Sequence, residues 1–398
     1  FTGNTEYTQK ELEKVITLKR GKLYQQEKYD ESLSNLQNLY ADKGYLHAGI
    51  EPQIKEDEKT ENLDINFVIT EGIVVSVDKI YIEGNNFTKE YVFRRELLVK
   101  EGDPLRAGLV RRSLERIYNL GFLDDVKVDL QQVKNPNLAD LIFTVSEGKP
   151  GVLSAGAGYS STDRLVGTLQ VQHLNLFGRA YRLNLLWEFG ARRQNYEIGF
   201  TDPWFLQKPM SFGVDIFDTA RAKQYGGDST AYWEKRQGGG LRLGPRLSDY
   251  LSLNFAYSYE KIEVYKVLDK YKNEIKEETK VTSSLTSSVI RDSRDNIFDP
   301  TRGSRNSFSI QLAGSFLGGD VDFYKPTLSS SWFFPTFWKF VLALNARFGL
   351  VNEISPSKEV PVYERFFVGG ADTVRAYGTG GEIGPSEGGK CMAVFNME

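Results

Sequence analysis

The stretch AYRLNLLWEFG, Ala180 to Gly190, decides the fold because its side chains alternate in character. The odd-numbered positions from Tyr181 to Phe189 are apolar, the even-numbered ones are mostly polar, and only Leu186 breaks the pattern. A period of two is that of a β-strand with one apolar face. Similar strands are predicted around this one, near 152–160, 165–174, 196–200, 210–218, 233–243, 250–262, 281–292, 304–315, 321–333, 338–351 and from 391 onward.

The connections between these predicted strands alternate in length. Short ones lie near 175–180, 202–209, 245–249, 295–303 and 334–337, and longer ones near 219–232, 263–280 and 352–390. Short turns at one end and longer loops at the other are typical of an up-and-down outer-membrane barrel. A soluble sandwich shows less consistent sidedness.

Aromatic residues gather at two of the short turns, and we interpret them as an interfacial girdle. The girdle residues are Trp204, Phe205, Trp332, Phe333, Phe334 and Trp338. Exposed rings would be a liability on a soluble barrel, whereas they suit a membrane–water interface. The negative mean hydropathy is compatible with a membrane barrel, because only alternate residues would meet lipid.

Before Lys149 the chain mixes helical and strand periods and repeats itself. Gly84-Asn85 matches Gly3-Asn4, and the segment LIFTVSEG ending at Gly148 matches DINFVITEG ending at Gly72. Each unit predicts the order β-α-α-β-β, with the opening strand missing from the first, so we divide this part into residues 1–72 and 73–150. Both units offer a sheet edge to which an extended peptide could add.

Composition excludes several classes of function. The net charge of -3 and the lack of a long Lys/Arg run argue against a nucleic-acid partner. One cysteine and two histidines disfavour a disulfide framework, a metal site or a histidine-based triad, and we expect no cofactor and no enzyme activity. Asp292 and Asp295 could suggest a carboxylate pair, but Arg291 and Arg294 beside them favour salt bridges. Both chain ends are interpreted as cut, so targeting signals could lie outside this sequence.

Four motifs, in this order and spacing, resemble the BamA family of bacterial outer-membrane β-barrel assembly factors. They are Asn175-Leu176-Phe177-Gly178, Thr201-Asp202-Pro203-Trp204-Phe205-Leu206, Arg291-Asp292-Ser293-Arg294-Asp295-Asn296 with Pro300-Thr301-Arg302-Gly303, and the loop Gly369 to Tyr377. The resemblance implies α+β POTRA repeats followed by a transmembrane antiparallel β-barrel. Residues 1–72 and 73–150 would be the last two POTRA domains, and 151–398 would hold about eleven or twelve of the family's sixteen strands.

The resemblance also implies a location and a role. The protein would be integral to the bacterial outer membrane, with its POTRA domains in the periplasm, and would insert and fold outer-membrane proteins without ATP. Its partners would be unfolded outer-membrane protein clients, accessory assembly lipoproteins and outer-membrane lipid. Two alternatives remain open: a two-partner secretion or translocation pore of the same superfamily, and an autotransporter-assembly factor.

The family's loop folds into the barrel and carries an arginine that pairs with acids on the strands just after it. By this resemblance 352–390 is the inward-folding loop, Val374, Arg375, Ala376 and Tyr377 form a loop latch, and Glu398 is one partner of Arg375. A buried guanidinium requires a carboxylate. The family has glycine at the position of Ala376, so either the backbone there is ordinary or this chain tolerates strain.

The first barrel strand is the predicted lateral seam. It consists of Val152, Leu153, Ser154, Ala155, Gly156, Ala157, Gly158, Tyr159 and Ser160. Its small residues leave little side-chain packing to hold a closing partner, so the strand could open and template a client. The simpler interpretation is that small residues merely suit a tapered wall.

Overall fold

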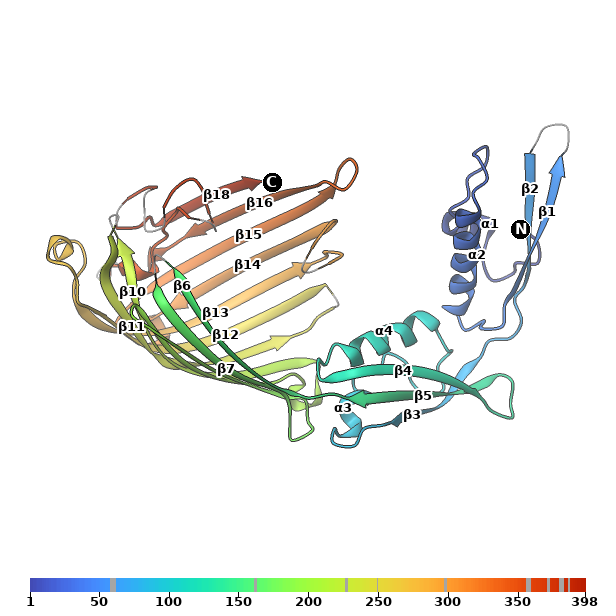
Figure 1. The fold of residues 1–398 in the computed structure, drawn as a ribbon, viewed down its shortest axis with the longest axis horizontal. Helices are drawn as coiled ribbons and strands as arrows, with labels where there is room; N and C mark the ends of the chain where they lie inside the picture. Colours follow the sequence, from blue (N-terminus) through green and yellow to red (C-terminus); the bar gives the residue numbers. More distant parts are fainter. Residues whose placement is uncertain are drawn as a thin grey trace. The chain divides into compact units, whose positions relative to one another are not determined.

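The computed structural model describes residues 1–57, 62–160, 163–225, 228–248, 250–296, 299–355, 359–370, 373–378, 383–385 and 387–398 (Figure 1). Internal contacts divide the chain into two compact units. The first comprises Phe1–Pro150 with Phe177–Ala180, and the second comprises Gly151–Leu176 with Tyr181–Glu398.

The first unit contains two successive repeats. The first has α1 (Gln9–Val15), α2 (Gln26–Ala41), β1 (Gly49–Asp57) and β2 (Asn62–Thr70), and Thr2 forms a parallel bridge to Val68 where an opening strand would lie. The second has β3 (Ser76–Glu83), α3 (Glu90–Arg94), α4 (Ala107–Tyr118), β4 (Leu123–Gln132) and β5 (Leu138–Glu147), with the strand order β3-β5-β4. The β-α-α-β-β order expected from the sequence is confirmed.

The repeated Gly-Asn and Glu-Gly dipeptides meet in space and close each repeat. Gly84 has φ +85°, and a Cβ there would collide with the carbonyl oxygen of Val145. The Glu147 carboxylate accepts hydrogen bonds from the backbone N–H groups of Phe87 and Thr88, at 2.9 and 2.7 Å. Gly3 and Glu71 make the equivalent contacts in the first repeat.

A buried serine fixes the two helices of each repeat. Ser32 Oγ donates to Lys28 O at 2.6 Å and accepts from the N–H of Thr17 at 3.0 Å. Ser113 Oγ likewise donates to Leu109 O and accepts from the N–H of Leu98, both at 2.8 Å. Each serine therefore satisfies a loop amide that burial would otherwise leave without a partner.

The second unit is one antiparallel sheet in which strands adjacent in sequence pair with one another. Its strands are β6 (Gly151–Ser160), β7 (Arg164–Leu176), β8 (Tyr181–Gly190), β9 (Arg193–Asp202), β10 (Met210–Tyr225), β11 (Asp228–Pro245), β12 (Leu251–Tyr265), β13 (Glu278–Asp292), β14 (Gly303–Ala313), β15 (Phe323–Pro335), β16 (Val341–Leu350), β17 (Asn352–Glu353) and β18 (Cys391–Met397). Short 3-10 helices interrupt the connections: η1 (Phe205–Gln207), η2 (Asp269–Tyr271), η3 (Ser315–Leu317) and η4 (Val362–Glu364). The order runs from β6 to β16 and then β18, with β17 paired to β15. The sheet is curved across its width (Figure 1).

The prediction of a loop at 219–232 is wrong. β10 and β11 continue through this segment as a hairpin, with pairing from Met210↔Pro245 to Tyr225↔Asp228. Ala222, Tyr225 and Tyr232 are buried in this extension. Apolar alternation marks only the part of a strand that would face lipid, so it does not indicate where a strand ends beyond that band.

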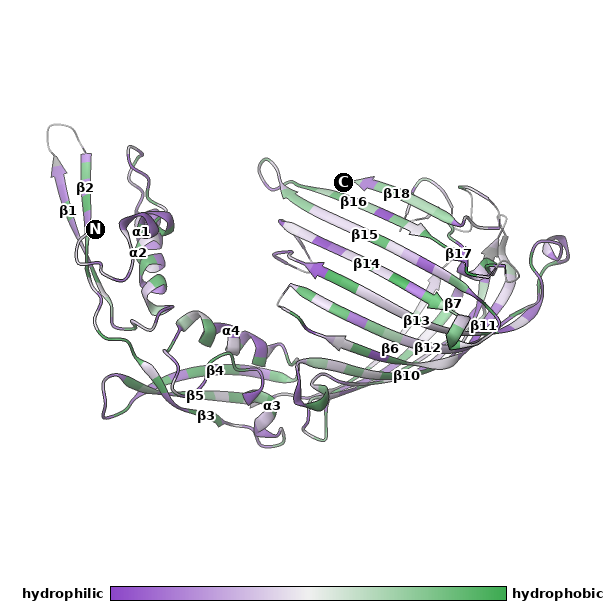
Figure 2. Cartoon of the chain, turned by 180° about the vertical axis from the view of Figure 1, so that it is seen from behind, coloured by the Kyte–Doolittle hydropathy of each residue, from purple (hydrophilic) through white to green (hydrophobic). Residues whose placement is uncertain are grey.

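The outward face of the sheet carries continuous apolar rows. Phe348, Leu328, Phe308 and Val289 lie opposite one another on β16, β15, β14 and β13, and they are 39, 41, 47 and 42% exposed. Figure 2 shows green and purple segments alternating along these strands. Among the described residues, no helix is long and apolar enough to span a bilayer.

Candidate functional site

The predicted seam strand lies at one end of the sheet. In the structure as described, β6 pairs with β7 and with no other strand, in a register from Gly151↔His173 to Ser160↔Arg164. Residues Gly151 to Tyr159 are all exposed, and a Cβ added at Gly156 or Gly158 would meet nothing within 4 Å. β18 lies at the other end of the same sheet.

The long connection 352–390 returns to the sheet at both ends. Lys390 Nζ contacts the Glu353 carboxylate at 2.8 Å, and Phe366 exchanges backbone hydrogen bonds with Gly389. The Phe366 ring packs on Gly349 of β16 so closely that a Cβ there would lie 2.5 Å from it. The two ends of the connection are therefore held to the sheet and to each other by a salt bridge, an isolated β-bridge and the packing of the Phe366 ring on Gly349.

The structure brings Arg375 and Glu398 together, but on an exposed surface. Arg375 Nη2 lies 2.5 Å from Glu398 Oε1, and the two side chains are 71 and 49% exposed. Val374 is half-buried, while Ala376 and Tyr377 are exposed. The guanidinium is thus paired but not buried here, and the role of the pair as a latch stays a prediction.

The backbone at Ala376 is ordinary. Its φ is not among the positive values found at non-glycine residues of the described chain. The turn is instead closed by hydrogen bonds from the N–H of Tyr377 to Val374 O at 3.2 Å and from the N–H of Gly370 to Tyr377 O at 2.8 Å. Alanine at this position therefore carries no left-handed strain.

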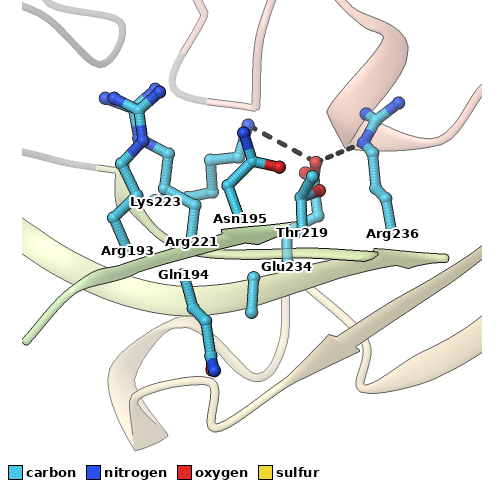
Figure 3. A pocket seen from close by; sticks show the side chains of 9 residues that line it. Arg193, Gln194, Asn195, Thr219, Arg221, Lys223, Glu234 and Arg236 are labelled. Carbon is cyan, nitrogen blue, oxygen red and sulfur yellow. Dashed lines mark hydrogen bonds and ion pairs between the residues drawn. The ribbon is translucent and has the colours of Figure 1, made fainter. Parts of the chain in front are cut away.

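A second ionic contact of the loop, made by Glu364, was not predicted from the sequence. Glu364 Oε2 lies 3.1 Å from Lys325 Nζ on β15, and Oε1 lies 4.0 Å from Arg236 Nη1 on β11. Arg236 also contacts Glu234 at 2.6 Å and Glu260 at 3.3 Å. In Figure 3, Glu234 lies between Lys223 and Arg236.

Apolar side chains of the loop pack beside these charges. Val362, Tyr363 and Phe367 lie against a cluster of buried residues from β10, β11, β12 and the connection after β12: Tyr225, Ala231, Tyr232, Val264, Val267, Tyr271 and Ile275. The guanidinium of Arg236 stands 5.6 Å from the ring centre of Tyr363. No sequence signal pointed to this contact, because its members are up to 142 residues apart, as Tyr225 and Phe367 are.

The aromatic residues near the short turns divide between the two faces. Trp332 and Phe334 are each 43% exposed and their rings are stacked, and Trp338 is 84% exposed. Phe333 lies between them on β15, so it faces the opposite side and does not belong with the predicted girdle. Trp204 and Phe205 are half-buried, and Phe205 stacks on Phe212.

The turn after β13 contains one salt bridge and one carboxylate that binds backbone. Asp292 pairs with Arg294 at 2.7 Å. Asp295 instead accepts hydrogen bonds from the Thr301 hydroxyl and from the N–H groups of Asn296, Thr301 and Arg302. These hydrogen bonds, the Thr301 hydroxyl foremost, hold the pKa of Asp295 well below its usual range. The salt bridge expected for Asp295 is thus replaced by a turn-closing role.

The turn Phe177–Ala180 belongs by its contacts to the first unit. The N–H of Lys89 donates to Gly178 O at 2.9 Å. Gly178 has φ +67°, and a Cβ there would collide with Phe87 O. This explains why glycine occupies that position of the Asn175-Leu176-Phe177-Gly178 motif.

These features together define a class of protein: β-α-α-β-β repeats followed by a curved antiparallel sheet with an apolar outer face and a loop returning to its wall. Comparison with known proteins agrees. Residues 175–398 match the Omp85 superfamily domain, and residues 1–72 and 75–148 match the POTRA model described as a surface antigen variable number repeat. The chain belongs to the Omp85 superfamily.

Relatives within this superfamily match almost the whole chain. The outer membrane protein assembly factor BamA of Neisseria meningitidis is 30% identical over 96% of this chain and 50% of its own length. BamA of Nitratidesulfovibrio vulgaris is 29% identical over 91% of this chain and 46% of its own length. The chain thus spans about half the length of these curated relatives.

A solved structure supports the fold. The crystal structure of BamA from Haemophilus ducreyi lacking POTRA domains 1–3 superposes with a TM-score of 0.72 at 24% identity, covering 99% of this chain and 80% of that chain. The chain is an outer-membrane protein whose sheet is part of a β-barrel wall and whose POTRA repeats lie in the periplasm.

Proposed function

We propose that the protein inserts and folds outer-membrane β-barrel proteins without ATP, and that β6 templates their incoming strands. The name of the relatives, outer membrane protein assembly factor, supports the general role. The observation that carries the templating step is the position of β6, an exposed strand of small residues at the end of the sheet.

The physical reason for a template lies in the bilayer. An unpaired backbone N–H or C=O group costs several kcal/mol in hydrocarbon, so a client strand must pair as it enters. Within the residues that the structure describes, β6 pairs only with β7, so its other side presents a row of such groups to a further strand, and main-chain pairing of this kind tolerates any client sequence. Ser154, Ala155, Gly156, Ala157 and Gly158 add little cross-strand packing, so release of the client is not opposed by side chains.

The POTRA repeats would receive clients and bind accessory assembly lipoproteins. In the part of the chain that the structure describes, no further strand pairs with β4 in the second repeat or with β1 in the first. An extended peptide adds to such an edge by strand pairing. Outer-membrane lipid would contact the apolar outer rows, and the protein would act as a non-enzymatic catalyst of assembly.

Locking the seam tests the role of β6. In the full-length protein, with the exposed Cys391 replaced by serine, one cysteine on β6 and one on the last barrel strand would be joined by oxidation. We expect client assembly in lipid vesicles, followed by heat-modifiable migration, to stop on oxidation and return on reduction.

The matched control places the cysteines at Asn254 and Ser288, which are partners on β12 and β13 in the middle of the sheet. This cross-link should leave assembly unchanged. Undiminished assembly in the seam-locked protein would overturn the templating role. A steady pore conductance without assembly activity would favour a secretion or translocation pore instead.

A further inference from the structure

One carboxylate of the inward loop contacts cations from two distant strands of the wall. Glu364 lies between Lys325 on β15, at 3.1 Å, and Arg236 on β11, at 4.0 Å. Strands β12, β13 and β14 separate these two strands in the sheet. The Glu364 side chain is only 9% exposed, so water screens these interactions weakly.

The curvature of the wall favours this contact (Figure 1). Four strand spacings of about 4.8 Å would separate β11 from β15 by about 19 Å along a flat sheet. Since a single carboxylate meets side chains from both strands, Glu364 must lie on the concave face, where side chains from distant strands converge. The loop thereby crosses the inside of the wall.

The charges at this point are balanced. Arg236, Lys325 and Lys223 face Glu234, Glu260 and Glu364. Arg236 also contacts Glu234 at 2.6 Å and Glu260 at 3.3 Å, and neither contact involves Glu364. A variant without the Glu364 charge therefore leaves Arg236 paired, and the wall should still fold.

We propose that Glu364 is a positioning residue that seats the loop and ties β11 to β15 across the inside of the wall. The tie acts independently of the exposed Arg375–Glu398 pair. It fixes the loop and the curvature of the middle strands. The inference concerns the loop and the wall, and does not rest on the proposed assembly role.

Hydrogen exchange tests the seating of the loop. In the full-length protein in lipid vesicles, we expect Glu364→Gln to raise amide exchange in residues 359–368 by about tenfold or more, as expected when one partner of a poorly screened pair is removed. Glu364→Asp, which keeps the charge, should restore most of the protection. Arg375→Gln should leave these amides unchanged. Unchanged exchange in Glu364→Gln, or an equal rise in Arg375→Gln, would overturn the proposal.

A distance measurement tests the tie across the wall. Spin labels at Leu241 on β11 and Leu328 on β15 lie on the outer face, away from the loop. We expect the distance distribution between them to broaden in Glu364→Gln and in Lys325→Gln, but not in Arg375→Gln. If Glu364→Gln fails to fold, Lys325→Gln alone decides the matter, because it removes only the contact with β15. An unchanged distribution in the folded variant would overturn the tie.

Discussion

At the scale of single residues, the POTRA repeats depend on positions whose role is geometric. Gly84 adopts φ +85° directly beside the carbonyl of Val145, and Glu147 accepts hydrogen bonds from the turn that follows this glycine. The repeated Gly-Asn and Glu-Gly dipeptides can be recognised in the sequence. Their contact with one another could not be predicted, because it joins residues 63 positions apart, as Gly84 and Glu147 are.

Replacing Gly84 separates backbone strain from crowding. Gly84→Ala should cost more than about 2 kcal/mol, since alanine would be strained at positive φ and would also collide with Val145 O. Gly102 has a similar φ of +88° but open space around it, so Gly102→Ala should cost only about 1 kcal/mol. Urea unfolding of the repeats, followed by hydrogen exchange, would measure both. Equal costs would show that the collision is relieved by a small shift.

Glu147 makes the second repeat sensitive to acid. Burial raises the pKa of Glu147, whereas hydrogen bonds from the Thr88 side chain and from backbone amides lower it. The hydrogen bonds together have the larger effect, so the net pKa lies below the usual 4.5. Because the folded-state pKa is depressed, its stabilising contribution is present above pH 4.5 and lost as the pH falls through the folded-state value. Glu147→Gln should therefore cost about 1 kcal/mol at pH 7 and progressively less below pH 4.5. A cost that does not change with pH would contradict this assignment.

Most of the ionic contacts between the loop and the wall could not be predicted from the sequence. Arg375 could be identified because it stands in a family motif. Arg236, Lys325 and Glu364 could not, because charged residues on alternating strands ordinarily face a polar interior without specific partners. Only the curvature of the sheet brings these three together.

At the scale of elements, the strands could be predicted from the sequence, whereas the packing of the loop could not. Period-two alternation located β6 to β16 and β18 well, because burial against lipid and the strand period are encoded in the same residues. It failed between β10 and β11, where the hairpin continues beyond the apolar band. For the loop, only an inward fold was predicted, because its position on the wall depends on contacts with residues far away in the sequence.

Arginine substitutions on β14 test which face meets lipid. Phe308→Arg should destabilise the barrel by about 2–4 kcal/mol, because its outward side chain would enter hydrocarbon near the middle of the strand. Ser307→Arg, on the neighbouring residue and the opposite face, should change the free energy of unfolding by about 1 kcal/mol or less. Unfolding from lipid vesicles measures both, and a reversed order would mean that the faces are assigned the wrong way round.

Arg375 should contribute little to stability in this geometry. Exposed ion pairs contribute about 0–1 kcal/mol, and the two side chains here are 71 and 49% exposed. We therefore expect Arg375→Ala to lower the free energy of unfolding by no more than about 1 kcal/mol at moderate salt. A loss of about 3 kcal/mol or more would indicate that the pair is buried in the full-length barrel.

At the scale of the whole molecule, the chain combines periplasmic repeats with a barrel wall. The change of pattern near Lys149-Pro150-Gly151 coincides with the division between the two compact units. The turn Phe177–Ala180 crosses that division, which no periodicity could indicate, because its membership follows from contacts with Phe87 and Lys89.

The central claim is that β6 pairs with client strands, and cross-linking in register tests it most directly. Single cysteines at successive positions of β6 in the full-length protein, without Cys391, would be oxidised against single cysteines along the last strand of a client during assembly in vesicles. The account predicts disulfides that advance along the two strands in one fixed register, and none from control positions on β9. Cross-links spread without register, or equally frequent from β9, would contradict it.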